Sequence, residues 1–405
     1  MIISVKNKIE RYILLALMLN VIFFTFFRLC YGFEVNKIFA DQSLKLNTRI
    51  NFALDLALKK YDGQRIWVIY SIDGYWTTNE SRMIQGSIKE NQTLEQIIFE
   101  KTFNKGSSWT EQAISNPIES SVPNKLIQIT SNKRVATQMD NKRRSDTKKI
   151  AIILDYSLES GNPCLYQIYL QRMNQPFSRE NRSIFWLGEE VTSISVNWLN
   201  DQFYHTKYLK LKQQIIASIG THNCSKQAIE FMKKIVWGNY SLLLKNEAIY
   251  WLSQHNSIES IKILAILAVK QTDIRLKKKA IFALSQIRDK KATTIVSVLA
   301  KQKKNRGIRQ EAIFWLSQIA DEDAIEVLNE ILTSENDHAI KDYTIFAISQ
   351  LPEMKATPIL YQIAQNSPDS RIRKKAMFWL HRTRDQRMMD FFMDLVHEEE
   401  QRGSN

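Results

Sequence analysis

Apolar and polar positions in the C-terminal half of the chain repeat at one fixed interval. A five-residue patch of small, aliphatic and aromatic residues occurs five times, beginning at Ala248, Ala280, Ala312, Thr344 and Ala376. Between successive patches lies a second apolar row at helical spacing, first seen at Leu264 and Leu267. Each unit is therefore predicted to hold two helices, which must stack on neighbouring units because one pair cannot bury its own apolar face. The pattern predicts an α-solenoid.

The second helix of each unit opens with an aliphatic residue followed by a base, as in Leu244-Lys245 and Leu276-Lys277. Together with the spacing of the patches, these residues resemble the HEAT-repeat family, in particular the phycobilin-lyase-type HEAT-like repeats, whose second helix reads V-R-x-x-A-x-x-x-L. The resemblance covers residues 206–397 and implies an irregular cap at 206–238 and regular repeats at 239–397. A looser similarity is to exported bacterial HEAT proteins that carry a small N-terminal domain.

Successive residues of the patch face different ways, because a helix turns by about 100° per residue. The Ala, the Ile that follows it and the Leu four positions after the Ala share one face and are predicted to form the core. The base near the start of the helix, such as Arg309, is expected to pack its stem and to extend its charged head outward. The fourth patch position alternates between large and small residues, which predicts packing between units: Trp251, Ala283, Trp315, Ala347, Trp379.

The third position of the patch is an aromatic residue that points about 200° away from the Ala, far from the centre of the core. These residues are Tyr250, Phe282, Phe314, Phe346 and Phe378. A glutamine follows beside the first four of them: Gln254, Gln286, Gln318 and Gln350. Since the second helix lines the concave side in HEAT-like arrays, the resemblance implies a stripe of rings along a groove, which would bind a protein partner. The alternative is a wide core that buries the rings and leaves no binding stripe.

The N-terminal half changes character and predicts a small α+β domain over residues 33–200. Residues 37–61 have the apolar spacing of an amphipathic helix. Runs rich in β-branched and aromatic residues then predict strands at 66–70, 126–130, 150–156, 165–170 and 183–187. We expect the third and fourth runs to pair antiparallel across the turn at Ser160 to Pro163, and the last run to add an edge strand. The carboxylates of Glu189 and Glu190 fit the first turn of a following helix.

Residues 1–32 predict a signal peptide or an N-terminal anchor. Three bases precede an apolar run from Tyr12 to Phe27, and Gly32 offers a small residue for cleavage. The run is short for a membrane span, which needs about 20 apolar residues, although an uncleaved anchor stays open. We therefore expect an exported protein of the periplasm or cell envelope, with membrane contact only through an uncleaved N-terminal segment. Such a compartment permits a disulfide between Cys164 and Cys224, although two separate thiols are the simpler interpretation.

The net charge is +14, and one segment, 133–149, holds seven basic residues against two acidic ones. Basicity alone is weak evidence for a polyanion partner, so nucleic acid is not favoured. The segment lacks apolar periodicity and is expected to be a solvated loop, with a polyanion-binding arm as the alternative. Residues 398–405 form a polar tail.

No sequence motif for catalysis, a cofactor or a metal is present. Phosphate-loop, dinucleotide and nucleophile-elbow strings are missing, and the six His are scattered. HEAT-type iron hydroxylases carry repeated His-Glu pairs, whereas only His397-Glu398 occurs in this chain. The hypothesis that follows is a non-enzymatic exported scaffold with a groove for a protein partner, flanked by charged residues that include Lys278, Lys279, Lys374 and Lys375. The alternative is an enzyme or ligand site in the N-terminal domain around Trp67, Tyr70 and Trp76.

Overall fold

The computed structural model describes residues 35–37, 44–74, 92–99, 149–177, 182–222 and 225–382. The chain divides into two compact units, with the boundary between Ser225 and Lys226. Several predicted features lie outside the described residues: the signal segment 1–32, strand 126–130, nearly all of the basic segment 133–149, Trp76, Cys224, and the C-terminal residues from 383 onward.

The described part of the first unit is built on a five-stranded sheet with the order β1-β5-β2-β3-β4. Its strands are β1 (Val35–Lys37), β2 (Arg65–Asp73), β3 (Lys149–Ser157), β4 (Cys164–Arg172) and β5 (Ser183–Glu189). Strands β2, β3 and β4 pair antiparallel, which confirms the predicted pairing of the last two. Strand β5 pairs parallel with both β1 and β2.

The prediction of an edge position for residues 183–187 was wrong, because β5 lies inside the sheet. Residues Ser183 to Leu187 are all buried, as expected for a strand that is covered on both faces. The run is apolar at consecutive positions rather than alternating, and this was the available signal for an interior strand. The short strand β1, which pairs with β5, was not predicted, and residue 37 belongs to it rather than to a helix.

Helices α2 (Leu46–Tyr61), α3 (Leu94–Phe99), α4 (Thr192–His205) and α5 (Leu209–Gly220) complete the described part of the first unit. On one face of the sheet, Trp67 and Ile69 of β2 pack with Leu94 and Ile98 of α3 and with Phe177. Helix α2 packs against β2 and β5, and α5 packs against β4.

Glu190 lies before α4 rather than in its first turn, which corrects the sequence interpretation of Glu189 and Glu190. Its side chain is buried and forms an ion pair with Arg49 of α2, and Arg49 also donates to the Leu187 carbonyl at 3.0 Å. Glu189 is the last residue of β5, where it pairs with Lys149. The carboxylate of Glu190 therefore joins α2 to the end of β5.

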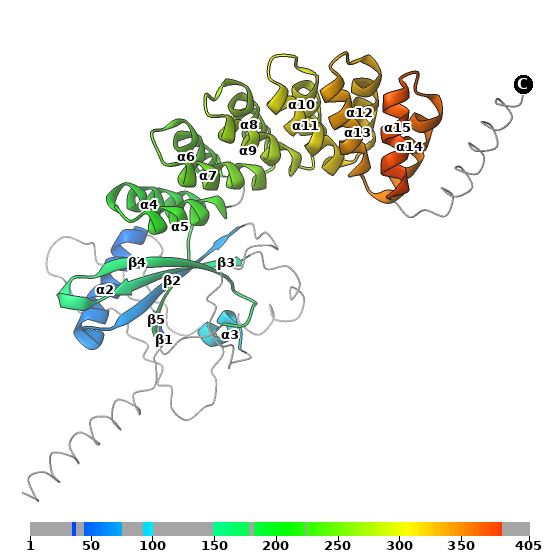
Figure 1. Ribbon diagram of the computed structural model, residues 1–405. Helices are drawn as coiled ribbons and strands as arrows, with labels where there is room; N and C mark the ends of the chain where they lie inside the picture. Colours follow the sequence, from blue (N-terminus) through cyan, green and yellow to red (C-terminus); the bar gives the residue numbers. More distant parts are fainter. Residues whose placement is uncertain are drawn as a thin grey trace, which may run out of the picture. The chain divides into compact units, whose positions relative to one another are not determined.

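Within the described residues, the second unit is an array of five helix pairs (Figure 1). The first helices of the pairs are α6 (Lys226–Trp237), α8 (Ile258–Lys270), α10 (Lys290–Lys301), α12 (Glu322–Ser334) and α14 (Glu353–Asn366). The second helices are α7 (Leu242–Gln254), α9 (Ile274–Ser285), α11 (Arg306–Ile319), α13 (His338–Ser349) and α15 (Ser370–His381). This arrangement confirms the predicted solenoid with two helices per unit.

In four units, a side chain that caps the second helix stands at the same position of the repeat. Asp273, Asn305, Asp337 and Asp369 each accept a hydrogen bond from a backbone N–H of the first turn. These N–H groups have no partner within the helix, and a cap of this kind contributes about 1 kcal/mol. The caps fix where each second helix starts, and therefore which residues of the patch face the core.

The base near the start of the second helix bonds to the end of the first helix of its own unit. Lys277 donates to the Val269 carbonyl at 2.9 Å, and Arg373 donates to the Ser367 carbonyl at 2.8 Å. Carbonyls at a helix end lack intrahelical partners, so these bonds close the hairpin between the two helices. The expectation that the charged head of Arg309 extends outward was wrong: its side chain is buried, and it donates to the Ala300 carbonyl at 3.1 Å.

Candidate functional site

The candidate site is the row of aromatic residues at the third patch position on α7, α9, α11, α13 and α15. Tyr250, Phe282, Phe314 and Phe346 are half-buried, and Phe378 is 55% exposed. The core positions beside them behave differently, since the Ala and Leu of every patch that has them are fully buried. The rings are therefore neither fully hidden, as in the wide-core alternative, nor fully exposed, apart from Phe378. We call the surface that the five rings share the ring face.

At two places along the array, a phenylalanine of the ring face contacts the tryptophan of the next unit. The centroid of Phe282 lies 4.7 Å from that of Trp315, and the centroid of Phe346 lies 5.6 Å from that of Trp379. Both phenylalanines belong to units whose fourth patch position is Ala, a residue too small to fill this space. The tryptophans therefore pack between units, as predicted. The sequence offered a packing role for the phenylalanines only as the wide-core alternative, and these contacts show one for Phe282 and Phe346.

In four units, a serine and a glutamine beside the ring form the same chain of two hydrogen bonds. The hydroxyls of Ser253, Ser285, Ser317 and Ser349 donate to the carbonyls of Tyr250, Phe282, Phe314 and Phe346 at 2.6–2.7 Å. In turn, the side-chain amides of Gln254, Gln286, Gln318 and Gln350 donate to these hydroxyls at 3.1–3.3 Å. Three of the glutamines are exposed and Gln254 is half-buried. Each amide is thus held beside its ring while its carbonyl oxygen and second N–H stay available.

The lysines predicted as flanking charges are partly neutralised by neighbours on the adjacent unit. Lys278 lies 3.1 Å from a carboxylate oxygen of Glu311, and Lys375 lies 2.5 Å from one of Asp342. The ammonium of Lys279 lies 4.5 Å from the centroid of Phe282, a cation–π distance. Lys374 is exposed. The charges near the ring face therefore hold neighbouring units together more than they create a field of one sign.

The ring face lies on the inner side of the array. Neighbouring second helices contact one another more extensively than neighbouring first helices do, so the array curves with the second helices inside. The helix pairs of the second unit follow this arc in Figure 1. An inner surface that carries an aromatic ring in every described unit can contact an elongated ligand along its length.

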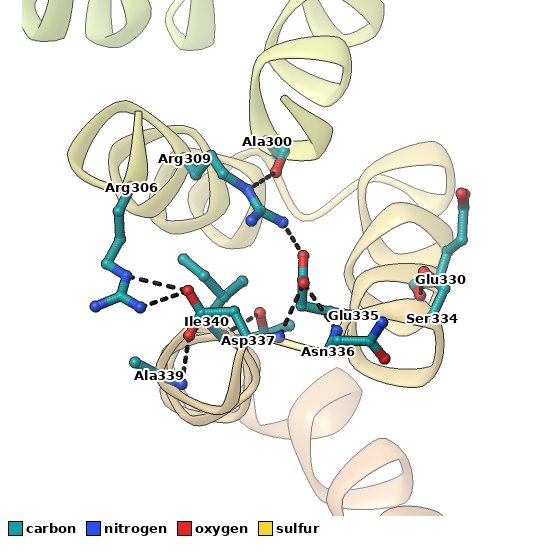
Figure 2. Close-up of polar contacts among 11 residues, drawn as sticks. Ala300, Arg306, Arg309, Glu330, Ser334, Glu335, Asn336, Asp337, Ala339 and Ile340 are labelled. Atoms are coloured by element: carbon teal, nitrogen blue, oxygen red, sulfur yellow. Dashed lines mark hydrogen bonds and ion pairs between the residues drawn. The ribbon is translucent and has the colours of Figure 1, made fainter. Parts of the chain in front are cut away.

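A buried ion pair fixes the geometry between two neighbouring units of the array. Figure 2 shows Arg309 reaching both the Ala300 carbonyl and Glu335, and the paired side chains are 7% and 9% exposed. Glu335 also accepts hydrogen bonds from the N–H groups of Asn336 and Asp337 at 2.8 and 2.9 Å. Burial raises the pKa of Glu335, but these bonds and the Arg309 guanidinium outweigh it and lower the pKa to about 2. The carboxylate is therefore charged at neutral pH and holds Arg309 in place.

Of the three aromatic residues proposed as an alternative site in the first unit, the two that the structure describes are core residues. Trp67 and Tyr70 are fully buried, with Trp67 packed against Phe177 at a centroid distance of 5.3 Å. The Tyr70 hydroxyl lies 3.0 Å from the Ser195 hydroxyl, and burial raises the pKa of Tyr70. Neither ring can line an open ligand site in this conformation.

The described ranges hold little other chemistry of the kind that defines a site. No group of three or more His, Cys, Asp or Glu side chains there is arranged to hold a metal ion. None of the helices in those ranges has the length and hydropathy that a membrane crossing requires. Cys164 is an exposed free thiol at the start of β4.

Comparisons with known proteins concern the helical array. The family model for HEAT repeats matches residues 261–349. Human deoxyhypusine hydroxylase is 13% identical, with a TM-score of 0.25, over 46% of this chain and 83% of its own. The CpcE–CpcF complex of phycocyanin lyase from Nostoc is 14% identical, with a TM-score of 0.27, over 46% of this chain and 75% of its own. No curated protein sequence matches the chain.

Proposed function

We propose that this protein, whose residues 261–349 are HEAT repeats, is a non-enzymatic scaffold that holds a segment of a partner protein on its ring face. The observation that supports this function most directly is the fixed amide beside a partly exposed ring, repeated at the same position of four units. Rings supply apolar contact area, and amides pair with the donor and acceptor groups of a peptide backbone. The export predicted from residues 1–32 would place this scaffold in the periplasm or cell envelope.

An extended segment in the polyproline II conformation suits the spacing of the units better than a helix does. Packed helices lie about 8–10 Å apart, so rings and amides recur at roughly that interval. Polyproline II rises about 3.1 Å per residue with three residues per turn, or about 9.3 Å per turn, and leaves its carbonyls free for hydrogen bonds. An α-helix repeats every turn of about 5.4 Å and bonds its carbonyls internally. The partner segment we propose therefore presents every third residue to a ring.

The proposed function can be tested by crosslinking and pull-down from the cell envelope with the full chain and two double variants. Phe314→Ser with Phe346→Ser removes two rings of the ring face. Ile266→Ser with Val298→Ser is the matched control, because these exposed residues are also one repeat apart but lie on first helices. We expect the first variant to lose its partners and the control to keep them, with circular dichroism showing both folded.

Two other outcomes would contradict the proposal. Partners retained by the folded ring variant would show that the ring face does not bind them. Binding that instead weakens steeply as salt is raised, and that survives the ring variant, would favour the alternative polyanion role for segment 133–149.

A further inference from the structure

The last described unit leaves apolar side chains partly uncovered that are buried in the earlier units. Met377 of α15 is half-buried, whereas its equivalents in the four preceding units, Ile249, Ile281, Ile313 and Ile345, are completely buried. Ile363 of α14 is likewise half-buried, while Leu267, Leu299 and Ile331 at the same position are at most 3% exposed. The incomplete cover is therefore specific to the last unit.

The cover that these residues lack comes from a following unit. Met377 and Ile363 have the neighbours of their own unit and of the preceding one, as their equivalents do. Among the described residues, the earlier equivalents also have a helix pair after them, whereas α15 is the last described helix. The end formed by α14 and α15 is thus an apolar surface shaped to receive the first helix of another unit.

The sequence that follows α15 has the pattern of such a helix. Shifted by four periods, residues 386–398 align with α8 (Ile258–Lys270). The six positions that are buried in α8 are all apolar in the later segment: Met388, Met389, Phe391, Phe392, Leu395 and Val396. Seven positions of α8 are exposed or half-buried, and they align with Gln386, Arg387, Asp390, Met393, Asp394, His397 and Glu398. Only Met393 among these residues is apolar, and it aligns with Ala265, which is half-buried.

The start of the segment also keeps the register of the first helices. Ser257, Asp289 and Asp321 cap α8, α10 and α12 by accepting a hydrogen bond from a backbone N–H of the first turn. Asp385 lies two periods after Asp321, at the equivalent position. Residues 382–385 separate α15 from the segment, a connection about as short as residues 255–257 between α7 and α8.

We propose that residues 386–398 form the first helix of a sixth unit and dock on the α14–α15 end, with Phe392 and Leu395 covering Ile363 and Met377. The partner of this surface is thus a segment of the same chain. The docked segment protects the last unit from opening, because an uncovered solenoid end exposes apolar area to water. The inference does not depend on the proposed function of the ring face.

Hydrogen exchange on the full-length protein tests the docking. Phe392→Asn places an amide at a position predicted to be buried, and Asp394→Asn places the same residue at a neighbouring position predicted to face solvent. We expect slow exchange over residues 388–398 in the unsubstituted chain. Phe392→Asn should accelerate exchange at least tenfold in that segment and in the last turns of α15, whereas Asp394→Asn should leave it unchanged. Unchanged hydrogen exchange in helices α8 to α12 serves as the internal control that both variants fold.

Three results would overturn the inference. Exchange in residues 388–398 as fast as in a free peptide would show that the segment does not dock. Equal effects of the two substitutions would show that it docks with another face. Protection that grows with protein concentration, together with a dimer in light scattering, would show that the surface takes the segment of a second copy.

Discussion

Phe282 of α9 packs on Trp315 of α11, with 4.7 Å between ring centroids, although the two residues lie in different units. The indole N–H of Trp315 donates to Glu311 at 2.8 Å, and Glu311 pairs with Lys278 of the preceding unit at 3.1 Å. One tryptophan thus joins an aromatic contact to a charged one across the same interface. Interfaces of this kind determine how rigidly the ring face is held.

Truncating both rings of this pair should cost less than the sum of the two single changes. We expect Phe282→Ala and Trp315→Ala each to destabilise the array by about 2 kcal/mol, with a coupling of about 0.5–1.5 kcal/mol between them. The measurement is a double-mutant cycle from urea unfolding. Phe282 and Trp379 lie in units that do not adjoin and should show no coupling; a similar value there would mean that the coupling does not arise from ring contact.

Replacing Glu335 should be far more costly than replacing Glu330. Glu335→Ala leaves Arg309 buried without its carboxylate, a change that costs about 3 kcal/mol, whereas Glu330 forms an exposed pair with Lys301 that contributes less than about 1 kcal/mol. Denaturant unfolding of the two variants measures the difference, and Figure 2 shows both glutamates. Equal losses would mean that the ion pair with Arg309 stabilises the array no more than a surface pair does.

The same carboxylate predicts a loss of stability in acid. The pKa of Glu335 is about 2 in the folded protein and near 4.5 when unfolded. The unfolded chain therefore binds the proton first, so the contribution of Glu335 is complete above pH 4.5 and is lost as the pH falls toward 2. Glu335→Gln should flatten the dependence of unfolding free energy on pH in that range. An unchanged slope in the variant would contradict the assignment.

The burial of His255 predicts that the stability of the protein also depends on pH in a second, higher pH range. The side chain is 1% exposed, and burial lowers its pKa from 6.5 to about 4. The unfolded state binds more protons between these values, so stability is complete above pH 6.5 and falls by roughly 3 kcal/mol as the pH drops to 4. His255→Phe should remove this slope, measured by unfolding at several pH values. The same change at the exposed His338 is the control and should retain the slope.

Two glycine-to-alanine substitutions should have opposite effects. A Cβ at Gly74 would lie 2.5 Å from the Thr221 carbonyl oxygen and 2.8 Å from Ile150, so Gly74→Ala forces apart the contact between the end of β2 and the turn after α5. A Cβ at Gly307, inside α11, meets Asn305 at an ordinary 3.5 Å. Gly307→Ala should stabilise by about 0.5–1 kcal/mol, and Gly74→Ala should lower the melting temperature. Thermal unfolding of both variants tests these two expectations.

The repeated patch predicted the array because each of its positions has one physical environment. Ala280, Ile281 and Leu284 are buried as their helical spacing requires, and the alternation of Trp and Ala packs between units. The buried head of Arg309 was not predictable, because its partner Glu335 lies in the loop between α12 and α13 and has no counterpart in the other units. Periodicity reveals what units share and says nothing of a contact that one unit makes alone.

The first unit was harder to predict because its strands pair out of chain order. The pairing of β3 with β4 follows from a short turn, whereas β5 pairs with β2 although α3, β3 and β4 come between them in the sequence. Trp67 and Tyr70 were considered as a site because aromatic residues serve both cores and ligand pockets, and only their burial separates the two roles. The amides of the ring face could be predicted by position. The serines beside them also recur in the sequence, but the role of their hydroxyls could not be predicted, since periodicity does not show which hydrogen bond a hydroxyl makes.

The Trp and Ala of successive units also limit how such a chain can be lengthened or shortened. Removing residues 273–304 would bring the unit of Trp251 against that of Trp315, and two indoles would compete for space that one indole and one methyl group fill. Removing residues 273–336 would instead bring the unit of Trp251 against that of Ala347, as in the intact array. The element that can be copied or deleted without repacking is therefore two helix pairs, and duplication in steps of two units is the mode of growth that this interior permits.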